Sequence, residues 1–241
     1  QYKLNYVQTS KGIVISSWEN ISTNKISGLY IPDTINELPV IGIGKNAFEE
    51  VYNYTRHYLT GEITLPDDLE YIGENAFYGC NEISKINFNE RLKSIGNNAF
   101  WCCNNLVGTL EMPNTISYIG KQSFASCDYE EIIFSNNLKI ISDSAFHNNT
   151  HLDDVIVIPE GVVSVGYSAF SSTPVYAAIL PSSLINLGDY AFGENKEIVE
   201  IAIKSENMES FRRNYNDNYK YYLMSGTQTS NYAETNNIDY E

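Results

Sequence analysis

The heptapeptide Tyr71-Ile72-Gly73-Glu74-Asn75-Ala76-Phe77 decides the fold of this chain, because the sequence contains seven versions of it. A repeat of this kind indicates a solenoid, in which each coil packs only against its neighbours. Seven phenylalanines close the seven versions and are 29, 23, 24, 22, 24 and 22 residues apart: Phe48, Phe77, Phe100, Phe124, Phe146, Phe170 and Phe192. We therefore expect one solenoid over residues 29–203, without an internal domain boundary and with a cap at each end.

Each repeat also contains a short β-like run, in which two apolar residues flank one residue of freer character. Residues two apart lie on the same face of a strand, so each run predicts one strand per coil. Because all coils turn the same way, these strands must be parallel. The apolar pairs are Leu29/Ile31, Ile63/Leu65, Ile86/Phe88, Leu110/Met112, Ile132/Phe134, Ile156/Ile158, Ala178/Leu180 and Ile201/Ile203. Five of the seven prolines follow a second member and, lacking an N–H, should end the ladder there.

A second apolar pair in each repeat is spaced by three residues, as in Leu69 and Ile72, and leads through a glycine into the Ala-Phe step. We expect these pairs and the phenylalanines to fill a continuous interior. The glycine should permit a positive φ or a close backbone approach, and the small alanine leaves room for the next coil. The repeat departs at Ser142, which replaces the glycine, and at Ser123, which replaces the alanine.

The two ends of the chain lack the repeat and are expected to cover it. Residues 1–28 carry a weak hairpin signal and predict an N-terminal cap, in the form of a β-hairpin. Residues 204–241 predict a C-terminal helical cap and a flexible tail. The helix is expected because apolar residues recur there every three or four positions: Met208, Phe211, Tyr215, Tyr219 and Tyr222.

The charge balance restricts the classes of partner. With 15 basic and 30 acidic residues, the formal net charge is −15, which repels phosphate backbones and offers no basic stripe to anionic lipid. We therefore expect no nucleic-acid binding. No apolar run approaches the roughly 20 residues that span a bilayer, so membrane insertion is not expected either. The sequence starting at Gln1 lacks a signal-peptide pattern, and we expect any export signal to have been removed.

Three features together resemble a known family, the BspA-like leucine-rich repeats of bacterial surface proteins. They are the strand followed by proline, the Ile-Gly-x-x-Ala-Phe segment, and the small residue three positions after the phenylalanine. The resemblance implies an α/β repeat solenoid, a right-handed leucine-rich-repeat coil with one parallel β-sheet on the concave face and short helical turns on the other. It also implies a non-enzymatic, secreted or surface-displayed binding or adhesion module. Its partners would be proteins or glycans of the host matrix, a host cell or another microbe.

The strands contain few residues that could act as catalytic acids or bases. A parallel β-helix lyase needs carboxylates at equivalent strand positions of neighbouring coils, to hold calcium or to act as acid and base. The middle strand positions hold one carboxylate, in the order Thr64, Asn87, Glu111, Ile133, Val157, Ile179 and Ala202. We therefore expect no catalytic residue, no cofactor and no metal site. A carbohydrate-active module, lectin-like or a polysaccharide lyase, and a structural spacer of a larger surface protein remain as alternatives.

The cysteines follow the repeat. Cys80, Cys103 and Cys127 each lie three residues after a repeat phenylalanine, where later repeats have Asn149, Thr173 and Asn195. We interpret this position as a buried ladder of small side chains that meet the backbone of the turn. Parallel Cβ vectors on stacked coils suit the dihedral angle of a disulfide poorly, so free thiols are expected. Cys102 lies off the ladder and is the cysteine expected to be reactive at the surface.

Two stretches are candidates for partner binding. The interval from Phe48 to Phe77 is about six residues too long, and the surplus contains Tyr52, Tyr54, Arg56 and Tyr58, which are residue types enriched at binding hot spots. The outward strand positions also change along the chain, from polar residues to Ile133, Val157 and Ile179, with Val155 and Ala177 beside them. A strand with one exposed face should alternate apolar and polar residues, and these strands do not. We therefore expect an apolar contact strip on the concave sheet.

Overall fold

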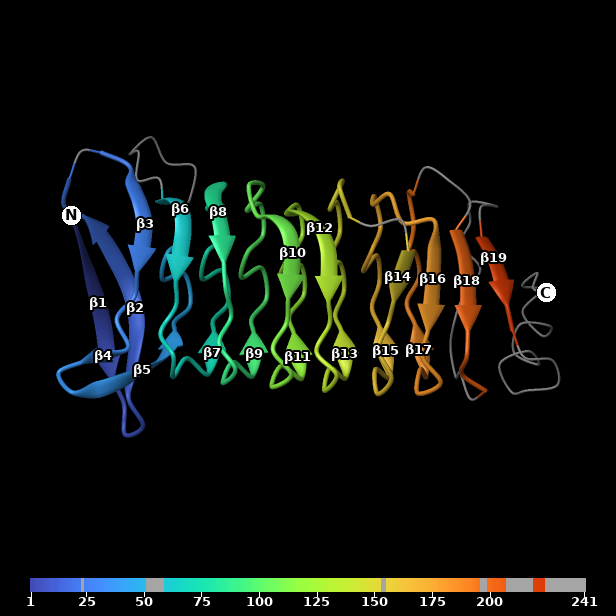
Figure 1. Ribbon diagram of the computed structural model, residues 1–241, viewed down its shortest axis with the longest axis horizontal. Helices are drawn as coiled ribbons and strands as arrows, with labels where there is room; N and C mark the ends of the chain where they lie inside the picture. The colour runs from blue at the N-terminus through green and yellow to red at the C-terminus, as the bar shows by residue number, and fades with distance from the viewer. Residues whose placement is uncertain (23, 51–58, 153–154, 196–198, 207–218, 224–241) are drawn as a thin grey trace.

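The computed structural model describes residues 1–22, 24–50, 59–152, 155–195, 199–206 and 219–223, which form an elongated right-handed solenoid of parallel strands (Figure 1). A typical coil consists of a long strand, a two-residue strand and a run of turns. Successive coils lie side by side, so that residues 1–22 and residues 219–223 lie at opposite ends of the described solenoid.

The long strands lie in one row (Figure 1), and all but the last come from the predicted apolar pairs. They are β3 (Ile26–Tyr30), β6 (Leu59–Thr64), β8 (Glu82–Ile86), β10 (Val107–Glu111), β12 (Asp128–Ile133), β14 (Val155–Val157), β16 (Ala177–Leu180), β18 (Val199–Ile203) and β19 (Tyr219–Tyr222). Hydrogen bonds join them in three groups, β3-β6-β8, β10-β12 and β14-β16-β18-β19. The repeat therefore predicts the first eight of these strands correctly, but the row is not one continuous ladder.

A second row of short strands was not predicted. It contains β5 (Leu38–Ile43), β7 (Tyr71–Ile72), β9 (Ser94–Ile95), β11 (Tyr118–Ile119), β13 (Ile140–Ile141), β15 (Ser164–Val165) and β17 (Asn186–Leu187). Each of these parallel strands contains the second residue of an apolar pair spaced by three. Ile72 is one example, and it pairs in register with Ile95 of the next coil. The expectation of one sheet is wrong because a pair spaced by three has no strand period, and strands of two residues are too short to show one.

An N-terminal hairpin extends the second row. Strands β1 (Tyr2–Gln8) and β2 (Ile13–Asn20) are antiparallel, and β2 pairs in parallel with β5, while β4 (Thr34–Ile35) forms a small antiparallel pair with β5. Trp18 of β2 lies 6.3 Å from the ring of Phe48, measured between ring centroids. The hairpin thus covers the aromatic core of the first coil.

The expected helical turns are absent from the residues that the structure describes. In the segment after Ile72, Asn75 has φ 53° and Gly79 has φ 75°, and later coils repeat left-handed residues at the same four-residue spacing. An α-helix needs consecutive right-handed residues, so it cannot form there. The backbone bonds instead to the next coil: the N–H of Asn75 donates to the carbonyl of Asn97 at 2.9 Å, and that of Phe77 to Ala99 at 2.8 Å. In the described part of the chain, no helix is long and apolar enough to cross a membrane.

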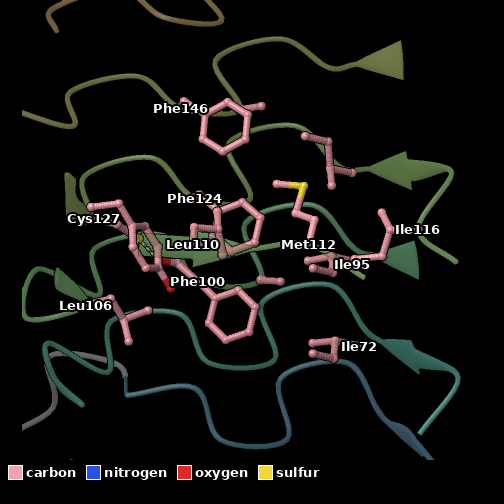
Figure 2. Close-up of a cluster of buried hydrophobic side chains, with 14 of the residues drawn as sticks. Ile72, Ile95, Phe100, Leu106, Leu110, Met112, Ile116, Phe124, Cys127 and Phe146 are labelled. Atoms are coloured by element: carbon pink, nitrogen blue, oxygen red, sulfur yellow. Dashed lines mark hydrogen bonds between the residues drawn. The ribbon is translucent and has the colours of Figure 1, made fainter. Parts of the chain in front are cut away.

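The core is a stack of the repeat phenylalanines. All seven rings are 0–1% exposed, and each lies nearly parallel to the next, with centroids 5.0 to 5.7 Å apart. Figure 2 shows Phe100, Phe124 and Phe146 in this order, beside Ile72 and Ile95 of the short strands. The repeat of 22 to 29 residues therefore places each phenylalanine ring directly against the ring of the next coil. Glycine is needed beside it for close approach: a Cβ on Gly120 would lie 2.4 Å from the backbone nitrogen of Asn97.

The C-terminal prediction fails at its end. Tyr219–Tyr222 is strand β19, which pairs in parallel with β18, and not the end of a helix. Tyr is a poor helix former and favours strands. The tyrosine-rich segment Tyr219–Tyr222 therefore pairs with the edge of β18, although the spacing of its apolar residues alone suggested a helix. Residues 207–218 and 224–241, which include Met208, Phe211 and Tyr215, lie outside the described residues.

Candidate binding face

The outward positions of the long-strand row divide it into two halves. In the N-terminal half, Thr64, Asn87 and Glu111 are exposed, as the strand pattern predicts. In the C-terminal half, Ile133, Val155 and Val157 are 48%, 43% and 55% exposed. Ile179 and Ala177 are half-buried beside them. We call these five residues the aliphatic face: Ile133, Val155, Val157, Ala177 and Ile179.

Strand register joins most of the aliphatic face. Val155 pairs with Ala177, and Val157 pairs with Ile179, which in turn pairs with Ala202 of β18. Neighbouring side chains of parallel strands in register lie about 5 Å apart, so these residues form one surface. Ile133 belongs to the β10-β12 group, which shares no ladder with β14 in the described residues. The expected strip is thus continuous from β14 to β16, with Ile133 on the adjoining group.

Carboxylates flank this face on the side of β10 and β12. Glu111 is the register partner of Ile133, and Glu131 is two residues before Ile133 on the same strand. Glu130 is also exposed and lies where the register shifts opposite Gly108 and Thr109. Glu131 accepts a hydrogen bond from the Thr109 hydroxyl at 3.0 Å. Sequence reasoning counted Glu111 alone, because the shift in register that aligns Thr109 with Glu131 cannot be read from repeat spacing.

In strands β6 and β8 of the same row, lysine side chains neutralise the carboxylates. Lys25 forms an ion pair with Glu82 at 2.5 Å, and Lys85 lies 3.7 Å from Glu62. In contrast, no ion pair is found for Glu111, Glu130 or Glu131 within the described residues. Negative charge therefore gathers beside the aliphatic face, whereas lysines compensate Glu62 and Glu82 on the same row.

The second predicted site falls in residues 51–58. Tyr52, Tyr54, Arg56 and Tyr58 lie outside the described residues, so their role in binding stays a prediction. The residues on either side are described, and the N–H of Leu59 donates to the Glu50 carboxylate at 2.6 Å. Burial raises the pKa of Glu50 to about 7, although this hydrogen bond works in the opposite direction.

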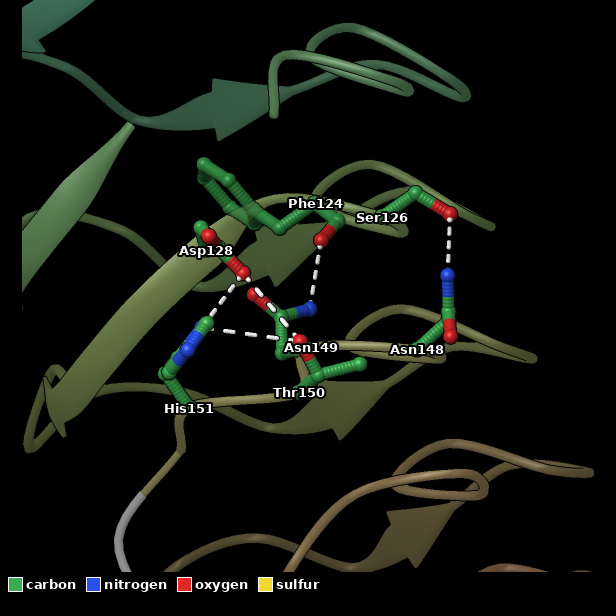
Figure 3. A network of polar contacts seen from close by, with 7 residues as sticks. All are labelled: Phe124, Ser126, Asp128, Asn148, Asn149, Thr150 and His151. Carbon is green, nitrogen blue, oxygen red and sulfur yellow. Dashed lines mark hydrogen bonds and ion pairs between the residues drawn. The ribbon is translucent and has the colours of Figure 1, made fainter. Parts of the chain in front are cut away.

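The cysteine ladder is confirmed. Each of the three thiols is buried and donates to the carbonyl of a phenylalanine on a preceding coil, at 3.1 to 3.2 Å: Cys80 to Phe48, Cys103 to Phe77 and Cys127 to Phe100. In the next coil, Asn149 donates to the carbonyl of Phe124 at 2.8 Å (Figure 3). All four cysteines are free thiols, and Cys102 is half-buried, off the ladder. This position is structural and offers no site.

The histidines do not converge. The ring of His151 bonds to Asp128 at 2.8 Å beside Thr150 (Figure 3), and the Asp128 carboxylate raises the pKa of His151 by this contact. His147 faces the Ser171 hydroxyl instead, at 2.7 Å. Among the described residues there is no group of three or more His, Cys, Asp or Glu side chains that could hold a metal ion.

These stacked coils have known counterparts. A family model described as "BspA type Leucine rich repeat region" matches residues 41–157 and 117–220, with six copies. The chain belongs to the BspA-type leucine-rich repeat family. Among solved structures, this BspA-type chain is similar to TpLRR, a leucine-rich repeat protein of T. pallidum, with 24% identity, a TM-score of 0.61 and 83% of each chain covered.

Two further solved structures share the BspA-type architecture. A leucine-rich repeat protein from Bacteroides ovatus is 21% identical with a TM-score of 0.59, over 92% of this chain and 69% of that one. A leucine-rich cell surface protein from Faecalibacterium prausnitzii is 23% identical with a TM-score of 0.55, over 89% of this chain and 55% of that one. At these identities the likeness shows the fold. A comparison with curated proteins finds no match.

Proposed function

We propose that this BspA-type solenoid is a non-enzymatic binding or adhesion module, secreted or displayed at the cell surface, that holds a macromolecular partner on its aliphatic face. The observation that carries the proposal is the exposure of Ile133, Val155 and Val157 at outward strand positions, where β6, β8 and β10 carry Thr64, Asn87 and Glu111. Leucine-rich repeats are a scaffold on which surface residues, and not the fold, decide the function.

Two physical arguments support this face over other parts of the surface. Contiguous exposed apolar side chains are unfavourable in water and commonly mark a contact site. The β-branched residues also stand on a parallel ladder, whose backbone is held by hydrogen bonds to β16 and β18, so little conformational entropy is lost when a partner binds. A rigid aliphatic surface of this kind suits a protein partner.

The surface location rests on the family and on a neighbour. The Faecalibacterium prausnitzii relative is described as a cell surface protein, and BspA-type repeats are typical of such proteins. We infer the same location for this chain, with host matrix proteins, host cells or other microbes as the source of the partner. The fold itself would serve as well in a spacer, and the binding experiment below separates the two roles.

The experiment measures binding of purified matrix and serum proteins to the immobilised chain by surface plasmon resonance. The test variant carries Ile133→Thr, Val155→Thr and Val157→Thr, which keep β-branching while making the face polar. The matched control carries Thr at three exposed aliphatic residues away from the face, Val7, Ile21 and Ile140. We expect at least about tenfold weaker binding for the test variant, a loss of about 1.4 kcal/mol, with an unchanged control.

Other outcomes would redirect the proposal. If the test variant retains full affinity, the aliphatic face is not the site, and the Tyr52, Tyr54, Arg56 and Tyr58 segment becomes the candidate. Shortening residues 51–58 then tests that segment directly. If no protein binds but a glycan array or a lyase assay with calcium is positive, the carbohydrate-active alternative replaces the proposal. A chain that binds nothing in any format is a spacer.

A further inference from the structure

We propose that the partner of the aliphatic face is a cationic, apolar polypeptide segment, in which Lys or Arg residues accompany aliphatic side chains. This inference deepens the proposed function and rests on it. It follows from two surfaces that meet at Ile133: the aliphatic face, and a set of carboxylates without ion-pair partners among the described residues. We call Glu111, Glu130 and Glu131 the acidic border.

Register places the acidic border against the aliphatic face. Glu111 is the strand partner of Ile133, so the two side chains are neighbours across the β10-β12 ladder. Glu131 points to the same side of β12 as Ile133, since residues two apart share a face. A segment that covers Ile133 with an aliphatic side chain therefore brings its adjacent residues next to these carboxylates. Cationic side chains are the ones that gain from that position.

The border is a local feature and not a consequence of the overall charge of −15. On the same row, Glu62 and Glu82 lie beside Lys85 and Lys25, which neutralise them. Apart from the bond that Glu131 accepts from Thr109, no hydrogen bond or ion pair is found for the border carboxylates in the described part of the chain. Among the described residues, the region around β12 thus combines exposed aliphatic side chains with carboxylates that have no ion-pair partner, although Glu130, after Asp128, also helps to raise the pKa of His151.

The same charges exclude other occupants. A nucleic acid or an anionic lipid surface would bring negative charge against the acidic border and be repelled. A second copy of this chain would present the same border to itself if the two aliphatic faces met. An acidic segment with aliphatic residues would bury its apolar side chains equally well, but like charges across an interface are unfavourable. A basic, apolar segment satisfies both surfaces.

Three synthetic peptides of equal length test the inference on the full chain: alternating Leu and Lys, alternating Leu and Glu, and alternating Ser and Lys. Affinity is measured by calorimetry in about 50 mM and 500 mM salt, because the screening length of exposed charges falls from about 14 Å to about 4 Å over this range. The charge variant is Glu111→Gln, Glu130→Gln, Glu131→Gln, which keeps side-chain size. Its control removes three exposed carboxylates elsewhere, with Glu37→Gln, Glu90→Gln and Glu206→Gln.

The expected result is binding of the Leu/Lys peptide, at least about tenfold weaker binding of the other two peptides, and weakening by salt. The charge variant should lose at least about fivefold in affinity for Leu/Lys, and its control less than about twofold. Equal losses in both charge variants would overturn the inference, because overall charge alone would then attract the peptide. Failure of the Leu/Lys peptide to bind would overturn it as well.

The outcomes separate this inference from the proposed function. If Leu/Lys and Leu/Glu bind equally, and the Thr variant of the aliphatic face weakens both, the face is a binding site and the inference about charge is wrong. If the Thr variant weakens no aliphatic peptide and no matrix protein, the proposed function itself fails. Thermal melting of each variant shows whether a loss reflects folding, since these exposed residues should leave the melting temperature unchanged.

Discussion

Replacing Ser123 by alanine should stabilise the solenoid. Ser123 takes the place of the repeat alanine, is 0% exposed, and its hydroxyl has no hydrogen-bond partner among the described residues. A buried hydroxyl left unpaired costs roughly 1–3 kcal/mol of desolvation. Removing one oxygen forfeits some van der Waals contact in a packed core, so we expect a net gain of about 1 kcal/mol. For a chain of this size, that raises the melting temperature by about 2–4 °C.

The reverse substitution provides the matched control. Ala145 occupies the same position in the next coil and is also 0% exposed, so Ala145→Ser should bring in an unpaired hydroxyl and lower the stability by a similar amount. Both variants and the wild type are compared by calorimetry and by urea unfolding. A lower melting temperature for Ser123→Ala would refute the reasoning, because it would mean that the hydroxyl has a partner that stabilises the coil.

Three further perturbations test the interior and its edge. Phe146→Ala should destabilise the chain by about 3–5 kcal/mol in urea unfolding, because the ring is held between Phe124 and Phe170 and its loss leaves a cavity; an unchanged midpoint contradicts the stack. Burial raises the pKa of the three ladder thiols, so a thiol reagent should label half-buried Cys102 first and the others only after denaturation; rapid labelling of all four contradicts the ladder. Because burial raises the pKa of Glu50 from 4.5 to about 7, its neutral form favours folding, and stability should fall as pH rises through this window. In melts from pH 4 to 8, Glu50→Gln should flatten that fall, and an unchanged pH dependence contradicts the burial.

The interior could be predicted almost residue by residue. The seven phenylalanines, the apolar pairs and the cysteine ladder all recur at fixed positions, and in a solenoid a recurring position is a stacked position. The repeat therefore reveals contacts such as that from Cys103 to the carbonyl of Phe77, which are far apart in the chain. Whether a side chain is buried depends on its position in the coil, and seven copies of one pattern show which positions are apolar and therefore buried.

The backbone between those positions could not be predicted in the same way. The run from Gly73 to Cys80 contains small and polar residues that fit either a helical turn or a series of turns, and the family resemblance favoured the helix. The outcome depends on left-handed φ angles at Asn75 and Gly79, and on hydrogen bonds to the next coil, which exist only once coils are stacked. Tertiary contacts thus override a local ambiguity here, as they do at Tyr219–Tyr222.

The candidate site could likewise be predicted only in part. Which residues point outward follows from the two-residue period of a strand, so Ile133 and Val157 could be placed on the surface from sequence. Which residues meet across strands depends on register, and one extra residue in β12, Glu130, shifts it, bringing Glu131 opposite Thr109 and Glu111 opposite Ile133. A repeat constrains inward side chains through packing and leaves outward ones free to vary. Binding specificity can therefore reside in the outward residues, and the pairing of aliphatic and acidic side chains at Ile133 is where it is best tested.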